Sequence, residues 1–466
     1  MIHIVGGGLA GSEAAWQVAR RGVPVCLSEM RPVRSTAVHQ TNYLAELVCS
    51  NSFRGDKLEN AVGLLKEEMR QLGSLVMQVA EQTRVPAGGA LAVDRTHFAE
   101  KITSMLASEP LVTIRRREVE HLPLPGPNDD PVIVATGPLT SERLSSDITA
   151  LVGREQLYFF DAISPIVLAE SIDYDRVFRA SRRGRRTGPP AELMQGDTCG
   201  SSPSDGDYLN CPMSASEYRR FYDALVTAEL AELHDLDSTP FFEGCLPIEV
   251  MAHRGIDTLR FGPMKPVGLV DPATGRMPYA VVQLRQDNLA AEHYSLVGFQ
   301  TQLKWPEQQR VLRLIPGLEK AEFVRFGMIH RNTYINGPTV LLRTWQSKKR
   351  PKLFFAGQLS GVEGYVESAA SGLVAGINAA ALALGERPRE LPRTTALGAL
   401  SYYVSHADSL NYQPTNIAYG LIPSLDSPPR GRQARRQALA KRALEDLEMW
   451  RKEAAEIHGT VSGVLS

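Results

Sequence analysis

Apolar and polar positions along the first thirty residues follow a strand, helix and strand order. A short apolar run at residues 2–5 is followed by a glycine-rich turn and by a helical pattern of small apolar residues at 12–20. A second apolar run at 23–29 ends in an acidic residue. Two short apolar runs joined by a helical segment are typical of parallel strands in a β-α-β unit. The opening of the chain therefore predicts an α/β fold.

Two later segments repeat this pattern far from the N-terminus. Residues 131–140, PVIVATGPLT, form an apolar run that ends in Ala-Thr-Gly. Residues 352–380 give an apolar run, a glycine-rich turn and a long helical stretch of small residues. We expect these strands to join the first two in one sheet. The sequence thus predicts a discontinuous domain made of residues 1–145 and 325–466.

The intervening residues 146–324 have a different pattern. A helix is expected after a cap at Ser214 or Ser216, and two alternating strands are expected at 279–286 and 292–301. Residues 183–207 are rich in Pro, Gly and Ser, which predicts a flexible loop. We interpret 146–324 as an inserted α+β domain. In the first part of the chain, Asp94 is expected to cap a helix over 94–106, and 111–122 is expected to be a strand.

The tail at 430–452 is helical by propensity and strongly basic. It could be a solvated helix face, or it could contact the phosphates of a nucleic acid. Two further basic clusters have the same two interpretations, namely Arg182, Arg183, Arg185 and Arg186, and Lys348, Lys349 and Arg350.

Composition narrows the class of protein. The 466 residues carry a net charge of -1, so the molecule as a whole is not a polycation. No apolar run approaches the roughly 20 residues that span a bilayer, and the first residues lack a signal peptide, so we expect a cytoplasmic protein without membrane contact. The five cysteines include no CxxC pair, which argues against a disulfide framework and against a metal site.

The glycine-rich turn predicts a dinucleotide site. Gly6, Gly8 and Gly11 form GxGxxG between the first strand and the first helix, and Gly7, Leu9 and Ala10 fill the motif. Glycines let backbone N–H groups approach a pyrophosphate, and the helix N-terminus adds a favourable dipole. Glu29 ends the second strand at the spacing expected for an acceptor of a ribose hydroxyl. The sequence thus predicts a Rossmann-like cofactor domain.

Two segments favour FAD as the resident cofactor. Thr136 and Gly137, in the Ala-Thr-Gly turn, resemble the second signature of flavoproteins with two dinucleotide-binding domains. Gly357, Gly364 and Tyr365 lie where the last strand and helix of that class meet. In that class the helix N-terminus points at the flavin ring, where its dipole favours a negative oxygen.

The cysteines differ in their surroundings. Cys26 lies within an apolar strand and is expected in the core, and Cys211 is expected to serve packing. Cys199 lies in the Ser- and Gly-rich loop, where we expect it to be incidental. Cys49, in ELVCSNSFRG, lies between an apolar run and a polar turn, where a thiol can be exposed. Cys245, in FFEGCLPIEVMAHRG, follows a glycine, so Cys49 and Cys245 are the two candidate reactive thiols.

Long stretches of the chain resemble the folate- and FAD-dependent tRNA (uracil-5-)-methyltransferases. The resemblance runs from residue 1 to about 423 and includes GGGLAGSEAAW, ELVCSNS, RVPAGGALAVDR, YLNCPM, FFEGCLPIEVMAHRG, VGFQTQLKWPEQ and GVEGYVESAASG. Related flavoproteins that modify wobble uridines share the cofactor signatures, whereas VCSNS and GCLPIEVMA look specific to the methyltransferases. The 183–207 loop is longer than the family pattern, and the tail beyond about 430 matches less closely.

The resemblance implies the chemistry and the partners. Methylenetetrahydrofolate provides a one-carbon unit for C5 of the T-loop uracil in tRNA, reduced FAD acts as methylene carrier and hydride source, and NADPH or NADH reduces the flavin. A thiolate that adds to C6 makes C5 nucleophilic, and a base then removes the C5 proton. The resemblance implies that Cys245 is the nucleophile and Cys49 the base or accessory thiol, with the order of these roles open.

Five further residues are candidate contacts for folate or RNA. His330, Arg331 and Asn332 could face the pterin, with Tyr365 opposite, or they could be satisfied structural residues. Lys265 and Arg285 could contact phosphate or the folate tail, or form structural ion pairs.

Three other functions stay open from the residues alone. The same chemistry could act on ribosomal RNA. The chain could instead be a flavin-dependent NAD(P)H oxidoreductase with Cys49 and Cys245 as a redox pair. It could also be an RNA-binding flavoprotein without catalysis. The joint presence of VCSNS and GCLPIEVMA favours methylation of an RNA.

Overall fold

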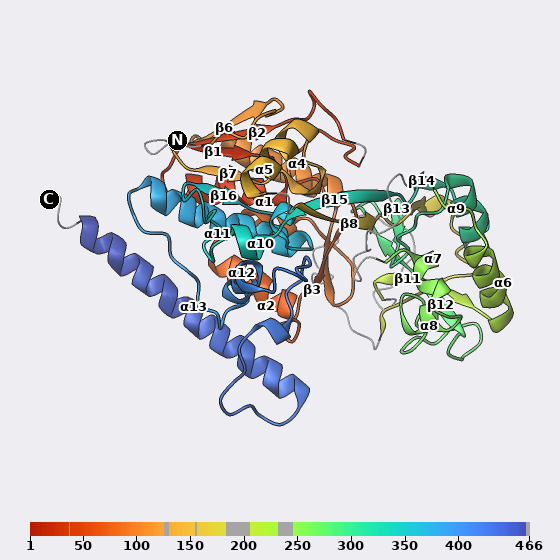
Figure 1. Ribbon diagram of the computed structural model, residues 1–466. Coiled ribbons are helices and arrows are strands. Elements are labelled where there is room, and N and C mark those ends of the chain that lie inside the picture. The colour runs from red at the N-terminus through yellow and green to blue at the C-terminus, as the bar shows by residue number, and fades with distance from the viewer. Residues whose placement is uncertain (37, 125–129, 154–155, 183–205, 232–245, 463–466) are drawn as a thin grey trace.

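A five-stranded parallel sheet forms the centre of the larger half of the molecule. The computed structural model describes residues 1–36, 38–124, 130–153, 156–182, 206–231 and 246–462 (Figure 1). The strands of this sheet, in the order β16-β7-β1-β2-β6, are β1 (Ile2–Val5), β2 (Val25–Glu29), β6 (Val112–Arg116), β7 (Val132–Val134) and β16 (Leu353–Phe355). In register, Ile2 of β1 lies opposite Val25, and Leu353 of β16 lies opposite Val132. The α/β prediction is confirmed, with strands from both ends of the chain in one sheet.

Helices of small residues pack close to this sheet. The helices of this half are α1 (Leu9–Ala19), α2 (Ala61–Gln71), α3 (Leu75–Gln82), α4 (Arg95–Ser108), α5 (Glu142–Val152), α10 (Gly337–Val340), α11 (Tyr365–Ala383), α12 (Ala396–His406) and α13 (Arg432–Ser462). α11 packs along α1. Among the described residues, α11 alone has the length and apolarity of a membrane span, yet 78% of its most apolar window is buried within the protein. It is therefore a core helix.

Two small sheets lie beside the parallel sheet. One has the order β3-β5-β4 and contains β3 (Ser52–Gly55), β4 (Arg84–Val85) and β5 (Ala90–Val93). The other is an antiparallel ribbon of β8 (Gln156–Ala162) and β15 (Ile329–Ile335), with Ile329 opposite Ala162. This ribbon lies between the two halves of the molecule (Figure 1).

The second half is built on a six-stranded sheet whose neighbours are antiparallel. Its order is β10-β11-β12-β13-β9-β14, and the strands are β9 (Ile166–Leu168), β10 (Phe178–Ala180), β11 (Tyr208–Met213), β12 (Ala280–Gln286), β13 (His293–Leu296) and β14 (Phe323–Arg325). Four helices belong to this half, namely α6 (Ala215–Val226), α7 (Ile248–His253), α8 (Thr258–Phe261) and α9 (Trp305–Leu312). Helices and an antiparallel sheet in one half fit the expected α+β character.

The buried side chains form two main clusters. One contains residues from 2–152 and 335–450, and the other contains residues from 167–321. We propose on this basis that the second half is an insertion in a discontinuous domain. The bounds 146–324 stay a prediction, and the first of them falls within α5, whose Ile148 and Val152 pack in the first cluster.

Several local predictions can be compared with the structure. Asp94 caps α4 by accepting the N–H groups of Thr96 and His97, as predicted. Ser214 begins α6 with a capping box completed by Glu217. The basic tail is helical, as α13, and Arg436 in it donates to the carbonyl of Glu59 at 3.1 Å. The expected loop at 183–207 lies almost wholly outside the described residues.

Candidate functional site

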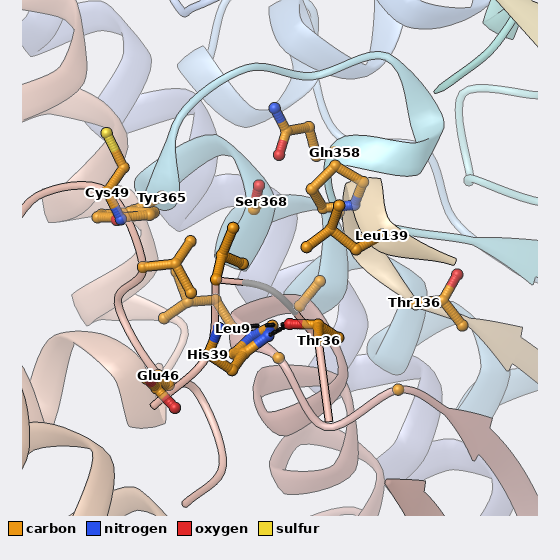
Figure 2. A pocket seen from close by; sticks show the side chains of 18 of the residues that line it. Leu9, Thr36, His39, Glu46, Cys49, Thr136, Leu139, Gln358, Tyr365 and Ser368 are labelled. Carbon is orange, nitrogen blue, oxygen red and sulfur yellow. Dashed lines mark hydrogen bonds between the residues drawn. The ribbon is translucent and has the colours of Figure 1, made fainter. Parts of the chain in front are cut away.

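One cavity of about 430 Å³ lies between the two halves of the molecule. Its first wall is formed where strands of the parallel sheet end and where α1 and α11 begin. Its second wall is formed by β12 and β13, through Arg285, Ser295 and Leu296. Crevices at the carboxyl ends of parallel strands are the usual ligand sites of α/β folds. Figure 2 shows that Cys49 and Tyr365 lie side by side in this cavity, with Thr36 and His39 in another part of it.

The glycine-rich turn between β1 and α1 is possible only without side chains at two positions. Gly6 has a φ of +103°, and a Cβ there would lie 2.4 Å from the carbonyl oxygen of Ala135. A Cβ on Gly11 would lie 1.8 Å from the carbonyl oxygen of Gly6. Gly8 is the N-cap of α1 and provides no side-chain cap, and Gly8, Leu9 and Ala10 line the cavity. These features suit a pyrophosphate at the helix start.

Glu29 lies at the end of β2 and lines the cavity. Its carboxylate accepts the N–H of Gly7 at 2.9 Å and the Nε–H of Arg31 at 2.9 Å. Burial alone would raise the pKa of Glu29, but these hydrogen bonds and the charge of Arg31 hold that pKa below its usual value. Glu29 is therefore ionised at neutral pH. Its role as acceptor for a ribose hydroxyl stays a prediction.

The loop that carries Cys49 is held by groups from distant segments. The N–H of Cys49 donates to the hydroxyl oxygen of Tyr365 at 2.7 Å, and the N–H of Ser50 donates to the same oxygen at 2.9 Å. The thiol of Cys49 donates to the carbonyl of Ala162 at 3.6 Å. Ala162 ends β8, so the thiol lies where the parallel-sheet half meets the ribbon between the halves. Cys49 is partly exposed, as its polar surroundings predicted.

Asn51 connects the same loop to both halves. Its amide nitrogen donates to the carbonyls of Val93 and Gln286, at 3.0 Å each. Arg285 donates to the side-chain oxygen of Asn51 at 2.8 Å and to the hydroxyl of Ser50 at 2.8 Å. Burial lowers the pKa of Arg285, although an arginine stays charged at neutral pH. Arg285 lines the cavity and also supports the Cys49 loop.

The structure brings most of the predicted site residues into this one cavity. The predicted residues that line it are Gly6, Gly7, Gly8, Leu9, Ala10, Glu29, Cys49, Thr136, Gly137, Arg285, Gly357, Gly364 and Tyr365. Gly11 lies one turn further along α1 and packs on Gly6. The roles of these residues stay predictions.

Of the remaining predicted residues, Lys265 and Asn332 are described and are not among those lining the cavity. Lys265 is partly exposed and follows α8 in the second half. Asn332 lies in β15 with 0% of its side chain exposed, and neither polar atom of its amide has a hydrogen-bond partner within the described residues. His330 and Arg331 belong to the same strand, and their side chains lie outside the described part of the chain, as does Cys245.

Two other cysteine predictions are confirmed. Cys26 is 1% exposed in β2, and Cys211 is 0% exposed in β11. Burial raises the pKa of the Cys211 thiol far above its usual value, so that thiol is inert.

Several charged residues at the cavity have no signal in local sequence patterns. Arg31 donates to Glu46 at 3.0 Å as well as to Glu29, which ties the loop after β2 to the segment before Cys49. Burial and the charge of Arg31 lower the pKa of His39 to about 4, so His39 is neutral at pH 7. Arg54 pairs with the fully buried Glu367 in the first turn of α11. The Arg31–Glu46 and Arg54–Glu367 pairs join segments that are separate in the sequence.

Comparison with known proteins gives a consistent result. The family model "Glucose inhibited division protein A" matches residues 1–387. Methylenetetrahydrofolate–tRNA-(uracil-5-)-methyltransferase TrmFO of Heliobacterium modesticaldum is 56% identical over 452 residues, which cover 97% of this chain and 98% of that protein. The protein of the same name from Moorella thermoacetica is 58% identical over 444 residues, which cover 95% of this chain and 97% of that protein.

Solved structures show the same fold. Aquifex aeolicus GidA in its form II crystal superposes with a TM-score of 0.64 at 17% identity, covering 99% of this chain and 76% of that one. The form I crystal of the same protein gives a TM-score of 0.66 at 18% identity, covering 96% of this chain and 76% of that one.

Proposed function

We propose, from the premise that this chain belongs to the Glucose inhibited division protein A family and within it to the methylenetetrahydrofolate–tRNA-(uracil-5-)-methyltransferases, that it methylates C5 of the T-loop uridine in tRNA. Methylenetetrahydrofolate is the one-carbon donor. The observation that carries this proposal is the meeting of three features in one cavity, namely the glycine-rich turn, the start of α11 and the Cys49 loop. A flavin-assisted attack on a pyrimidine requires a dinucleotide-binding turn next to a reactive thiol.

FAD is the resident cofactor in this proposal. The uncapped start of α1 at Gly8 suits its pyrophosphate, and Glu29 suits a ribose hydroxyl. Gly364 is the N-cap of α11, with a φ of +106° and no side-chain cap, which suits a negative flavin oxygen at that helix start. When bound and reduced by NADPH or NADH, FAD supplies a hydride and carries the one-carbon unit.

The protein itself supplies the thiol chemistry. The thiolate of Cys245 adds to C6 of the uracil, which places the negative charge on the enolate and makes C5 nucleophilic. After C5 has gained its carbon, Cys49 removes the C5 proton. A hydride, which bound and reduced FAD would supply, would complete the methyl group, and loss of the Cys245 sulfur then restores the ring. The order of roles of the two thiols is part of this proposal. The target uridine must leave its stack to reach a cavity of this kind.

Methylation of defined RNAs tests this function. Purified protein loaded with FAD is incubated with NADPH, one-carbon-labelled methylenetetrahydrofolate and unmodified tRNA, and ribothymidine is mapped by nuclease digestion and mass spectrometry. We expect label at the T-loop uridine and none in a matched tRNA with cytidine at that position. Label in ribosomal RNA but not in tRNA would keep the chemistry and change the substrate. NADPH consumption without label in either RNA would favour an oxidoreductase.

A further inference from the structure

The hydroxyl of Tyr365 connects the first residue of α11 to the loop that carries Cys49. Its oxygen accepts hydrogen bonds from the N–H of Cys49 at 2.7 Å and from the N–H of Ser50 at 2.9 Å. The two donors are consecutive amides, although Tyr365 lies 316 positions from Cys49 in the chain. One side chain of a core helix thus fixes the peptide unit beside the thiol (Figure 2).

The hydrogen-bonding capacity of a phenol limits what else this hydroxyl can do. A phenolic oxygen accepts through its lone pairs and donates one proton. Since two amides donate to this oxygen, Tyr365 acts toward a further group as a donor. Among the described residues, the hydrogen bonds of the Tyr365 hydroxyl are the two that it accepts. Because Tyr365 lines the cavity, an oxygen of a bound group is the partner that suits it.

The hydroxyl keeps its proton at neutral pH. Burial raises the pKa of Tyr365 well above its usual value, and the negative charge of a Cys49 thiolate raises it further. The ring is also fixed in place, because it packs against Phe53 with the two ring centres 6.0 Å apart. Tyr365 is therefore a rigid neutral donor rather than a base.

Other groups hold the residues on both sides of Cys49. Before it, Arg95 donates to the carbonyl of Leu47 at 2.8 Å. Arg285 binds the side chains of Ser50 and Asn51, and Asn51 binds the backbone of β5 and β12. The backbone amide of Cys49 depends on Tyr365. Loss of the phenol would free the peptide between Cys49 and Ser50, while the residues on both sides stay attached.

We propose that Tyr365 is a positioning residue for Cys49. Its hydroxyl oxygen fixes the peptide between Cys49 and Ser50 and thereby the direction of the thiol, and its proton is donated to an oxygen of the pyrimidine that the thiol faces. The identity of that pyrimidine rests on the proposed function. The hydrogen bonds from the two amides to the Tyr365 oxygen do not depend on the proposed function.

Tyr365→Phe tests this role, with Tyr403→Phe as the matched control. Tyr403 also donates its hydroxyl proton, to the carbonyl of Gln413 at 3.0 Å, but it is not among the residues lining the cavity. We expect Tyr365→Phe to lower kcat for methyl transfer by about 10- to 100-fold, as misplacement of a reacting group does. Alkylation of Cys49 by iodoacetamide should rise several-fold because its loop opens, whereas Cys26 and Cys211 should stay protected. The control should change neither quantity.

Unchanged Cys49 alkylation and unchanged kcat in Tyr365→Phe would overturn the proposal. If Cys26 and Cys211 also become reactive, the variant has unfolded. Hydrogen exchange in the wild-type protein then tests whether Tyr365 holds the two amides. Slow exchange of the Cys49 and Ser50 amides is expected because both are hydrogen-bonded, and fast exchange would overturn the proposal. If the wild type transfers no methyl group, the proposed function fails, while alkylation and hydrogen exchange still test the positioning role.

Discussion

Cys49→Ala is expected to lower kcat for methyl transfer by about a thousandfold or more, the scale of loss when a reacting group is removed. FAD binding and thermal stability should change little. The reason is that the thiol is partly exposed and the backbone N–H that binds Tyr365 is unchanged by the substitution. The measurement is single-turnover methylation of unmodified tRNA, together with flavin content and Tm.

Cys211→Ala is the matched control for this change. Its side chain is 0% exposed and packs in the core of the second half, so its removal should cost about 1 kcal/mol of stability. It should keep kcat near the wild-type value. Cys49→Ala is thus expected to lower kcat at unchanged stability, and Cys211→Ala is expected to lower stability at unchanged kcat. Near-normal kcat in Cys49→Ala would remove Cys49 from the reaction.

Gly11→Ala is expected to abolish FAD binding and to destabilise the protein by about 2 kcal/mol or more, as overpacking against rigid groups does. The new Cβ would lie 1.8 Å from the carbonyl oxygen of Gly6, and a backbone atom cannot rotate away. The turn between β1 and α1 must therefore open. Flavin absorbance of the purified protein and the Tm of the apoprotein measure both effects.

Gly8→Ala separates the cofactor effect from the folding effect. A Cβ there meets no atom within 4 Å, and the φ of Gly8 is -72°, so the apoprotein should keep its Tm. FAD affinity should still fall, because the methyl group would stand where a pyrophosphate approaches the helix start. Full flavin content with an unchanged Tm in Gly11→Ala would contradict this account of the turn.

Local patterns predicted the elements well where short-range chemistry determines them. Asp94 caps its helix as predicted, and of the two predicted caps Ser214 and Ser216 it is Ser214 that begins α6, because a capping bond joins residues two or three positions apart. Strand ends were less accurate. The strand expected to end in Ala-Thr-Gly at 135–137 ends at Val134, since Gly137 takes a φ of +67° and begins a short 3-10 helix. The strand expected over 292–301 ends at Leu296, shortly before Gly298 with a φ of +77°.

The site was predictable in its parts but not in its connections. The glycine-rich turn and the Cys49 motif are local and could be recognised directly. The bonds from Tyr365 to Cys49 and from Arg285 to Asn51 join residues 316 and 234 positions apart. No periodicity or spacing encodes such pairs, because the fold brings them together. The sequence predicts for Arg285 either a contact with phosphate or the folate tail or a structural ion pair, whereas its hydrogen bonds to Asn51 and Ser50 are seen only in the structure.

The origin of the methyl carbon tests the central claim most directly. Wild-type protein with bound FAD is incubated with unmodified tRNA, NADPH and methylenetetrahydrofolate deuterated in its one-carbon unit, and the nucleosides are analysed by mass spectrometry. The account predicts ribothymidine whose methyl group carries both folate deuterons, formed without S-adenosylmethionine. Unlabelled ribothymidine, or ribothymidine formed only when S-adenosylmethionine is added, would contradict it.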